Sequence, residues 1–406
     1  MTFPTALRHK SPATVPAPRP LPTPVPLPAP APAPSPEPAA VARAATPLHP
    51  LTHGFLPRRL PVPHLSGAWT DLDDLARAAA AAPSREVARL LVERACRDEE
   101  LAVLRRRVAR LSEHRATAAA MRMAVVVAAC GWTGLDPHAP VSRRTANEQF
   151  LALWASLAHR SDHQQFVALP TLSLLNWTPV RKPGRAVAVD QLARAESLTP
   201  IVRWSAPGLP LSRLDRLMLA TVRLEAHGTW LFRLAESLAG RTPGDDAVGV
   251  ALSRMTRIQH ALLRHLRLSA VQLNLAPATA QQCAVLDALA EQEALEPPVL
   301  LVSDAVLGMG GRMGVGSRYQ LRRHLPARHR AWLSTLDRRS AALRTLAHRR
   351  GPDADAYREA QESLVALRCA YAGLVRTAGT PSPGGRAPVV PRGSGAPGRP
   401  VPRLSA

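Results

Sequence analysis

The sequence contains almost no lysine. Only Lys10 and Lys182 occur among its 52 basic residues, and all the others are arginines. A formal net charge of +22 usually suggests nucleic acid or an anionic membrane as a partner. The arginines are spread along the whole chain, however, and the largest basic cluster, residues 338–350, has no interleaved aromatic residues that could stack on bases. We therefore expect no nucleic-acid partner.

Paired cysteines and long hydrophobic runs are also missing. Cys96, Cys130, Cys283 and Cys369 are far apart and form no Cys-x-x-Cys pair, so neither a disulfide framework nor a zinc site is expected. Free thiols are typical of a reducing compartment. The longest apolar run, residues 123–130, is much shorter than a membrane span, and no signal-peptide core follows the first charges. These absences predict a cytoplasmic protein that does not enter a membrane.

The 41 prolines are concentrated at the two ends of the chain. Residues 1–49 are predicted to form a disordered or polyproline arm, and residues 379–406 a disordered Gly/Pro-rich tail. An arm of this composition is typical of tethers that recruit a protein partner. Between the ends, residues 50–378 are expected to form one helical domain, with a smaller part at about 50–200 and a larger part at about 201–378.

Apolar residues recur at helical spacing through this middle region, which predicts an all-α fold. In the first half, Val87, Leu90 and Leu91 mark one amphipathic helix, residues 101–111 mark a second, and residues 123–129 are apolar on all sides, as in a central helix.

Three longer helices are expected in the second half. The first runs from about Leu214 to Gly240, the second over residues 248–273, and the third over residues 355–377. A strand remains an alternative for the apolar run 300–307.

Several familiar motifs are incomplete. The segment LGMGGRMGVGS has glycines at 308, 310, 311, 314 and 316 but no following Lys-Ser or Lys-Thr and no clear preceding strand, so we expect a turn rather than a nucleotide site. His260 and His265 are five residues apart, as are His324 and His329, which is not the spacing of zinc hydrolases and favours structural roles. The Gly-x-Ser-x-Gly elbow of serine hydrolases does not occur.

Four segments resemble the indoleamine 2,3-dioxygenase family of haem enzymes. The segment HGFLPRRLPVPHLSGAWTDLDDLA (53–76) is similar to the family's entry, and LPTLSLLNWTPVRKPG (169–184) is similar to its Leu-Pro…Asn-Trp phrase. The segment LRRHLPARHRAWLSTL (321–336) looks like the Tyr-Met-Pro-Pro-x-His-Arg-x-Phe-Leu signature. Finally, YREAQESLVALRCAYAGLV (357–375) resembles the helix that carries the axial histidine. The order and spacing of these blocks agree with the family.

The resemblance implies a haem b site and names its residues. The family's axial phrase is Leu-Arg-Ser-Tyr-His, which places Arg368 on its arginine and Tyr371 on its haem-ligating histidine. Asp304 falls on the aspartate that pairs with this arginine beside the haem. Tyr371 is thus the residue implied as the axial iron ligand, with Arg368 and Asp304 as further cofactor-binding residues.

Ligation by Tyr371 requires that its phenol lose a proton, and Arg368, one helical turn earlier, is expected to favour that loss. Cys369 should point elsewhere, because it is about 200° around the helix from Tyr371. Three alternatives stay open: haem ligated by Tyr371, haem held by another residue such as a nearby histidine, and no haem.

Two further departures from the family concern its loops. The family's small-residue substrate loop is replaced by QEALEPP (292–298), and its closing Gly-Thr-Gly-Gly loop is represented by GTPSPGG (379–385). The resemblance implies a haem-dependent oxygenase that uses O₂ or peroxide on tryptophan or a related indole or aromatic metabolite. The superfamily's pyrrolnitrin-biosynthesis relative extends this to secondary metabolism. The alternative is a haem-free binding or scaffold protein.

Overall fold

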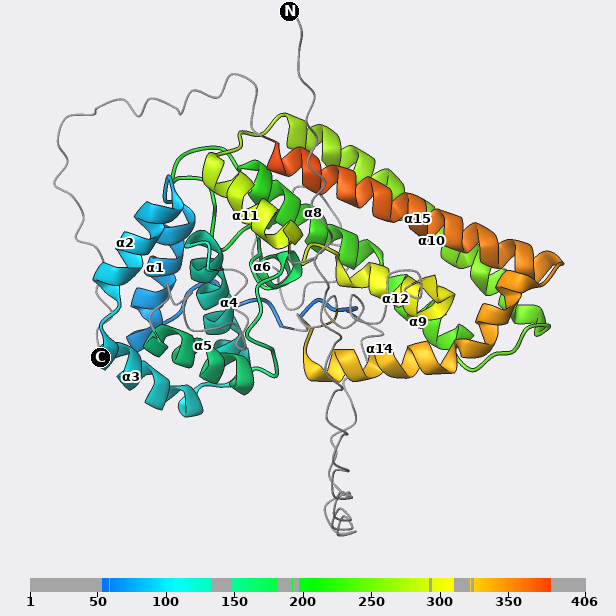
Figure 1. The fold of residues 1–406 in the computed structure, drawn as a ribbon, viewed down its shortest axis with the longest axis horizontal. Coiled ribbons are helices and arrows are strands. Elements are labelled where there is room, and N and C mark those ends of the chain that lie inside the picture. Colours follow the sequence, from blue (N-terminus) through cyan, green and yellow to red (C-terminus); the bar gives the residue numbers. More distant parts are fainter. Residues whose placement is uncertain are drawn as a thin grey trace, which may run out of the picture. The chain divides into compact units, whose positions relative to one another are not determined.

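The computed structural model describes residues 53–57, 59–132, 148–180, 192, 197–291, 294–309, 322 and 325–380. This part of the chain is almost entirely helical (Figure 1), so the predicted all-α class is confirmed. The arm at 1–49, the tail from 381 on, and the glycines from 310 to 316 lie outside the described residues. Within those residues, every helix is too short or too polar to cross a lipid bilayer.

The first helices pack around α4 (Glu113–Ala129), which contacts α1 (Thr70–Ala80), α2 (Arg85–Ala95) and α5 (Glu148–Arg160). From Ala116 onward all but one of the side chains of α4 are buried, as predicted for a central helix. One of them is Arg122, whose Nε lies 2.8 Å from the Oδ1 of Asp73 on α1. This buried ion pair joins the two helices at a point where both charges are removed from water.

The helix predicted from Val87, Leu90 and Leu91 exists as α2, but its buried face differs. Val87 and Leu90 are 37% and 50% exposed. The buried residues are instead Ala88, Val92 and Ala95. Alanines at this spacing bring the backbone of α2 close to its neighbours, so the larger side chains are left on the outer face. The next segment forms α3 (Asp98–Arg107), followed by a short 3₁₀ turn, η3 (Val108–Arg110), and another such turn, η2 (Gly67–Trp69), precedes α1.

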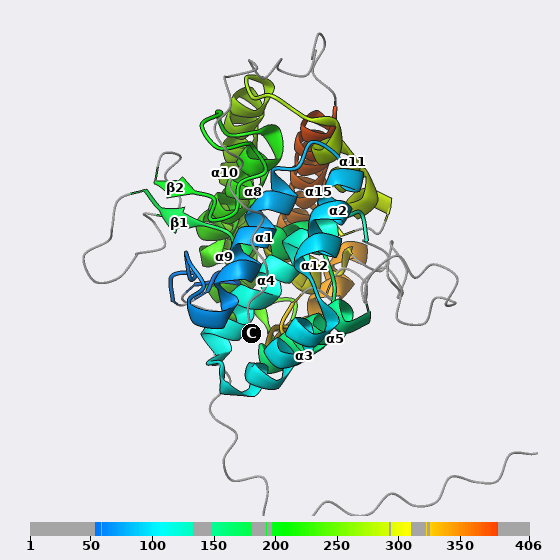
Figure 2. The same cartoon turned by 90° about the vertical axis from the view of Figure 1, so that its left-hand side faces the viewer.

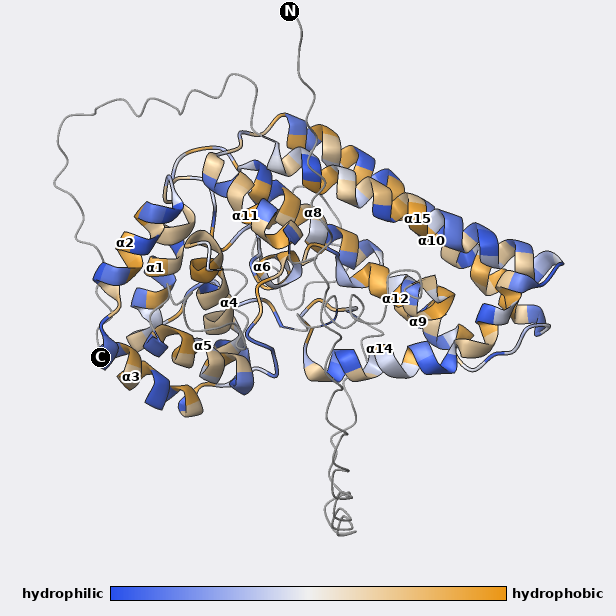
Figure 3. Cartoon of the chain, in the orientation of Figure 1, coloured by the Kyte–Doolittle hydropathy of each residue, from blue (hydrophilic) through white to orange (hydrophobic). Residues whose placement is uncertain are grey.

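The second group of helices is dominated by two long ones, α10 (Asp246–Asn274) and α15 (Pro352–Gly379), which lie side by side (Figure 1). They confirm the helices predicted over 248–273 and 355–377. The remaining elements of this group are α6 (Leu169–Leu174), α8 (Arg213–His227), α9 (Thr229–Leu238), α11 (Ala280–Glu291), α12 (Pro298–Leu307), α14 (Ala327–Arg339) and η6 (Ala341–His348). Figure 3 shows mainly hydrophobic residues on α12 and more hydrophilic ones on α14.

The single helix predicted from Leu214 to Gly240 is wrong, because the chain breaks at Gly228 into α8 and α9. A Cβ added at Gly228 would lie 2.2 Å from the Cγ2 of Val299. The glycine therefore lets the start of α12 pack directly against the break. The residues around Gly228 in the sequence do not predict this contact. The end of the predicted helix is nearly correct, since α9 ends at Leu238 and Gly240 has a φ of 84°.

The apolar run 300–307, left open as a strand, is the helix α12. All ten of its residues are buried, so its sequence has no polar face that would reveal a period. Pro298 begins the helix, and Gly308, with a φ of 65°, ends it. Among the described residues, two-residue strands β1 (Thr178–Pro179) and β2 (Leu198–Thr199) do form, and they pair antiparallel (Figure 2).

All four cysteines are free thiols. Cys96, Cys130 and Cys283 are buried, whereas Cys369 on α15 is exposed. Cys369 thus points away from the buried Tyr371, as its position on the helix predicts. Burial raises the pKa of the Cys96 and Cys130 thiols to about 12, so neither ionises near neutral pH.

Candidate functional site

Tyr371 lies on α15 and is 4% exposed. Its hydroxyl is 3.0 Å from the Oγ1 of Thr221 on α8, which also donates a hydrogen bond to the carbonyl oxygen of Leu217. The Thr221 hydroxyl has one proton, and Leu217 accepts it, so Tyr371 is the donor in their contact. The phenol is therefore held as a hydrogen-bond donor to the neighbouring helix.

The surroundings keep this phenol protonated. Burial raises the pKa of Tyr371, and the carboxyl groups of Glu225 and Glu296 raise it further. Arg368 was expected to favour a tyrosinate, but its guanidinium pairs with the carboxylates of Glu296 and Asp304, and the pKa of Tyr371 is raised.

Arg368 and Asp304 do come together. Nη1 of Arg368 lies 3.3 Å from Oδ1 of Asp304 on α12, and Nε lies 2.6 Å from Oε1 of Glu296. Glu296 comes from the segment that replaces the family's substrate loop. Burial raises the pKa of the Glu296 carboxyl, although Arg368 acts in the opposite direction. This group of three charges joins α15 to α12 and to the segment that precedes it.

Glu225 on α8 is the most deeply buried acid near Tyr371. Its Oε1 accepts a hydrogen bond of 2.7 Å from the backbone N–H of Val299. The two residues before Val299 are prolines without an N–H, so Glu225 satisfies the first free amide of α12. Its Oε2 has no hydrogen-bond partner in the described part of the chain. Burial raises the pKa of Glu225 to about 8, which keeps the carboxyl mostly protonated at neutral pH.

These residues, as arranged, do not fit haem ligation by Tyr371. An iron atom bonded to the phenol oxygen would have to take the place of Thr221, which sits at hydrogen-bond distance from it. In the metal-free protein the pKa of the Tyr371 phenol is raised, so the phenol is neutral and its hydroxyl is engaged with Thr221. The Asp304–Arg368 contact agrees with the resemblance, but it accounts for the packing of α12 on α15 without any cofactor.

The histidine closest to this region along α8 is His227, whose ring centroid lies 4.8 Å from that of His265 on α10. Burial, together with His227 and Arg223, lowers the pKa of His265 to about 4. Two imidazoles are a minimal metal site at most. In the described ranges, no three histidine, cysteine or acidic residues are grouped so that they could hold a metal ion.

The segments implied as substrate loops are described only in part. Residues 292 and 293 lie outside the described residues, as do residues 381–385 of the second loop. Gly379 and Thr380 are the end of α15, where Arg213 donates hydrogen bonds to the carbonyl oxygens of Thr377 and Thr380. These described residues therefore close the helix rather than border a substrate.

A cavity of about 480 Å³ lies elsewhere, between the segment at residues 53–59 and the starts of α4, α6 and α14. We call it the histidine cavity, because His53, His114, His163 and His329 line it. Sequence reasoning missed it, since its residues come from separate segments with no common spacing. The only signal was that three of the segments quoted for the resemblance, 53–76, 169–184 and 321–336, contribute to its wall.

Comparisons with known proteins add no assignment. Neither a protein-family model nor a curated protein matches this sequence.

Proposed function

We propose that this chain is a haem-free member of an indoleamine 2,3-dioxygenase-like fold that binds a small molecule in the histidine cavity. In this proposal the residues around Tyr371 stabilise the helical core. The absence of haem is supported by the contact between the Tyr371 phenol and Thr221, since the pKa of that phenol is raised. The binding of a small molecule is supported by the histidine cavity.

The polar groups near Tyr371 support a structural role because each of them contacts a neighbouring helix or segment. Glu225 accepts from Val299, Arg368 pairs with Glu296 and Asp304, and Tyr371 contacts Thr221. The first two sets of contacts join α8 or α15 to α12 and the segment before it, and the third joins α15 to α8. The Oε2 of Glu225 and the Nη2 of Arg368 have no partner among the described residues. A catalytic pocket would instead present such groups to a substrate.

A haem-dependent oxygenase acting on tryptophan or a related aromatic metabolite is the second candidate function. The contact between Asp304 and Arg368 favours it, since the resemblance implies that pair beside the haem. The two candidates differ in an observable property. Only an oxygenase of this type needs iron bound in the protein.

The absorption spectrum of the purified full-length protein, after expression with added haem, tests the proposal. We expect no Soret band. A Soret band that Tyr371→Phe abolishes or shifts would refute the proposal in favour of Tyr371 ligation. A band that survives this substitution would refute it in favour of another ligand.

Tyr357→Phe is the matched control for that comparison. Tyr357 lies on the same helix, is 1% exposed, and donates a 2.6 Å hydrogen bond to the carbonyl oxygen of Leu307. Its replacement removes a buried phenol hydroxyl at a position that the resemblance does not link to iron. A spectral change common to both variants would therefore report on folding alone.

A further inference from the structure

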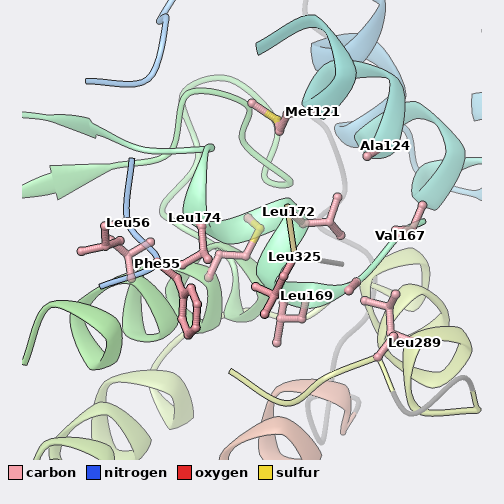
Figure 4. Close-up of a cluster of buried hydrophobic side chains, with 14 of the residues drawn as sticks. Phe55, Leu56, Met121, Ala124, Val167, Leu169, Leu172, Leu174, Leu289 and Leu325 are labelled. Carbon is pink, nitrogen blue, oxygen red and sulfur yellow. The ribbon is translucent and has the colours of Figure 1, made fainter. Parts of the chain in front are cut away.

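The histidine cavity has an apolar wall made by side chains from three separate segments. Phe55, Leu174 and Leu325 line it and belong to one cluster of buried hydrophobic residues (Figure 4). The ring of Phe55 is fixed from behind by an edge contact with Phe232 at 4.9 Å. A volume of about 480 Å³ is within the range of small-molecule sites in proteins. The wall is therefore preformed and suited to an apolar or aromatic body.

Charges at the cavity are predominantly positive. Arg59, Arg328 and Glu113 are its charged lining residues. Arg328 and Glu113 form an ion pair, with Nη1 3.3 Å from Oε1. Arg59 has no carboxylate partner among the described residues, so one cation at the cavity is left uncompensated.

The imidazoles of the cavity are subject to this positive charge. Burial, together with Arg328 and His163, lowers the pKa of His329 to about 3. Burial also lowers the pKa of His114, and Arg59 is the next cause, whereas a hydrogen bond with the backbone of Leu60 acts in the opposite direction. Both rings are therefore neutral near pH 7.

Two buried polar atoms of the lining residues lack partners. Neither the Nδ1 of His329 nor the Oγ1 of Thr171 makes a hydrogen bond within the described part of the chain. Leaving such atoms buried and unpaired costs about 1–3 kcal/mol each. Both atoms have almost no accessible surface, so they are closed off from a molecule in the cavity.

A turn in an uncommon backbone conformation joins two walls of the cavity. Asp162, between the lining residues Ser161 and His163, has a φ of 58°, the only positive value at a non-glycine position among the described residues. Its carbonyl oxygen accepts a hydrogen bond of 3.2 Å from the N–H of Ala327, at the start of α14. This bond places His163 near His329. Strained turns of this kind are found disproportionately at ligand sites.

We propose that the histidine cavity binds a small organic anion, an aromatic carboxylate being the simplest form, with its apolar body against Phe55, Leu174 and Leu325. The carboxylate interacts with Arg59, an exposed cation among the lining residues. The proposal rests on the proposed function, because it names the class of ligand that a haem-free binding protein would take.

Calorimetric titration of the full-length protein with three probes tests this assignment. 2-Naphthoate has both an aromatic body and a carboxylate, 2-naphthamide has the body without the charge, and inorganic phosphate has charge without the body. We expect saturable binding of 2-naphthoate, with 2-naphthamide at least about tenfold weaker and phosphate weaker still. Equal binding of the two naphthyl compounds, or no binding of 2-naphthoate, would overturn the proposal.

Two variants connect binding to the named groups. Arg59→Gln should weaken 2-naphthoate binding about tenfold. The control Arg94→Gln, which removes an exposed arginine of α2, should leave it unchanged. Thr171→Val should raise the Tm and leave the affinity for 2-naphthoate unchanged, because it removes an unpaired buried hydroxyl that the ligand does not reach. A tenfold loss of affinity in this variant would contradict the placement of the carboxylate at Arg59.

The failure of this assignment is distinguishable from that of the proposed function. A colourless protein that binds neither naphthyl compound would leave the haem-free proposal standing and refute the anion site. A Soret band would refute the haem-free proposal, whatever the titrations show.

Discussion

Replacement of Glu225 by glutamine should make the protein more stable, and the gain should grow with pH. Glu225 is fully buried, and its Oε1 accepts the Val299 N–H while its Oε2 has no partner within the described residues. Glutamine has the same shape and can accept the same hydrogen bond. It differs in having no ionised form, so the change removes the cost of keeping a carboxyl group in this place.

The size of the effect follows from the pKa. In the unfolded chain the Glu225 carboxyl has its ordinary pKa of 4.5, and in the folded protein burial raises the pKa to about 8. Below pH 4.5 both states hold the proton, so the group adds no pH dependence. Between 4.5 and about 8 the unfolded chain releases the proton while the folded protein keeps it, and stability falls as the pH rises. At about 1.4 kcal/mol per pH unit, the full loss is about 5 kcal/mol.

Other groups titrate in the same pH interval. The effect of Glu225 is therefore measured as the difference in the free energy of unfolding between the wild type and Glu225→Gln. Urea unfolding of the wild type and of Glu225→Gln should give free energies of unfolding that differ by less than about 1 kcal/mol at pH 5. By pH 8 the variant should be more stable by about 3–5 kcal/mol. The neighbouring Tyr371 stays neutral throughout, because its pKa is raised.

The control is Glu359→Gln on the exposed side of α15, which should follow the wild type at every pH. If wild type and Glu225→Gln lose stability in parallel between pH 5 and pH 8, then Glu225 is ionised in the folded protein. The interpretation of the core around Tyr371 would then be wrong.

Three further substitutions test the packing by urea unfolding. Tyr371→Phe should lower the free energy of unfolding by about 1 kcal/mol, the cost of one hydrogen bond, and a loss several times larger would indicate a further role for the phenol. Gly228→Ala should cost about 1–3 kcal/mol, because its methyl group would overlap Val299; a neutral result would contradict the close approach of α12. Asp73→Asn should cost about 3–5 kcal/mol by leaving Arg122 buried without its counter-charge, and an unchanged protein would show that water reaches this pair.

Long helices could be predicted because their apolar residues repeat over many turns. This is why α10 and α15 agree with the predicted ranges, and the buried residues of α15, which include Leu364, Leu367 and Tyr371, recur at helical spacing. The break at Gly228 could not be predicted, because its cause is the approach of Val299 from a distant part of the chain. Periodicity describes a helix, but not what packs against it.

The candidate site shows the same limit. Position on the helix correctly predicted that Cys369 points away from Tyr371, which is buried while Cys369 is exposed. The position of Arg368 on its helix did not predict the pair with Glu296. Glu296 lies in the segment 292–298, for which the resemblance offers no counterpart. The histidine cavity depends wholly on contacts between distant segments, so local sequence patterns could not reveal it.

The unequal exposure of the thiols has a practical use. Cys96, Cys130 and Cys283 are buried, so a maleimide dye or spin label should react selectively with Cys369. A label there would sit on α15 beside Arg368, with no engineered cysteine and no mutation of the core. The native chain therefore has an attachment point for spectroscopic probes that can follow movements of its longest helix pair in solution.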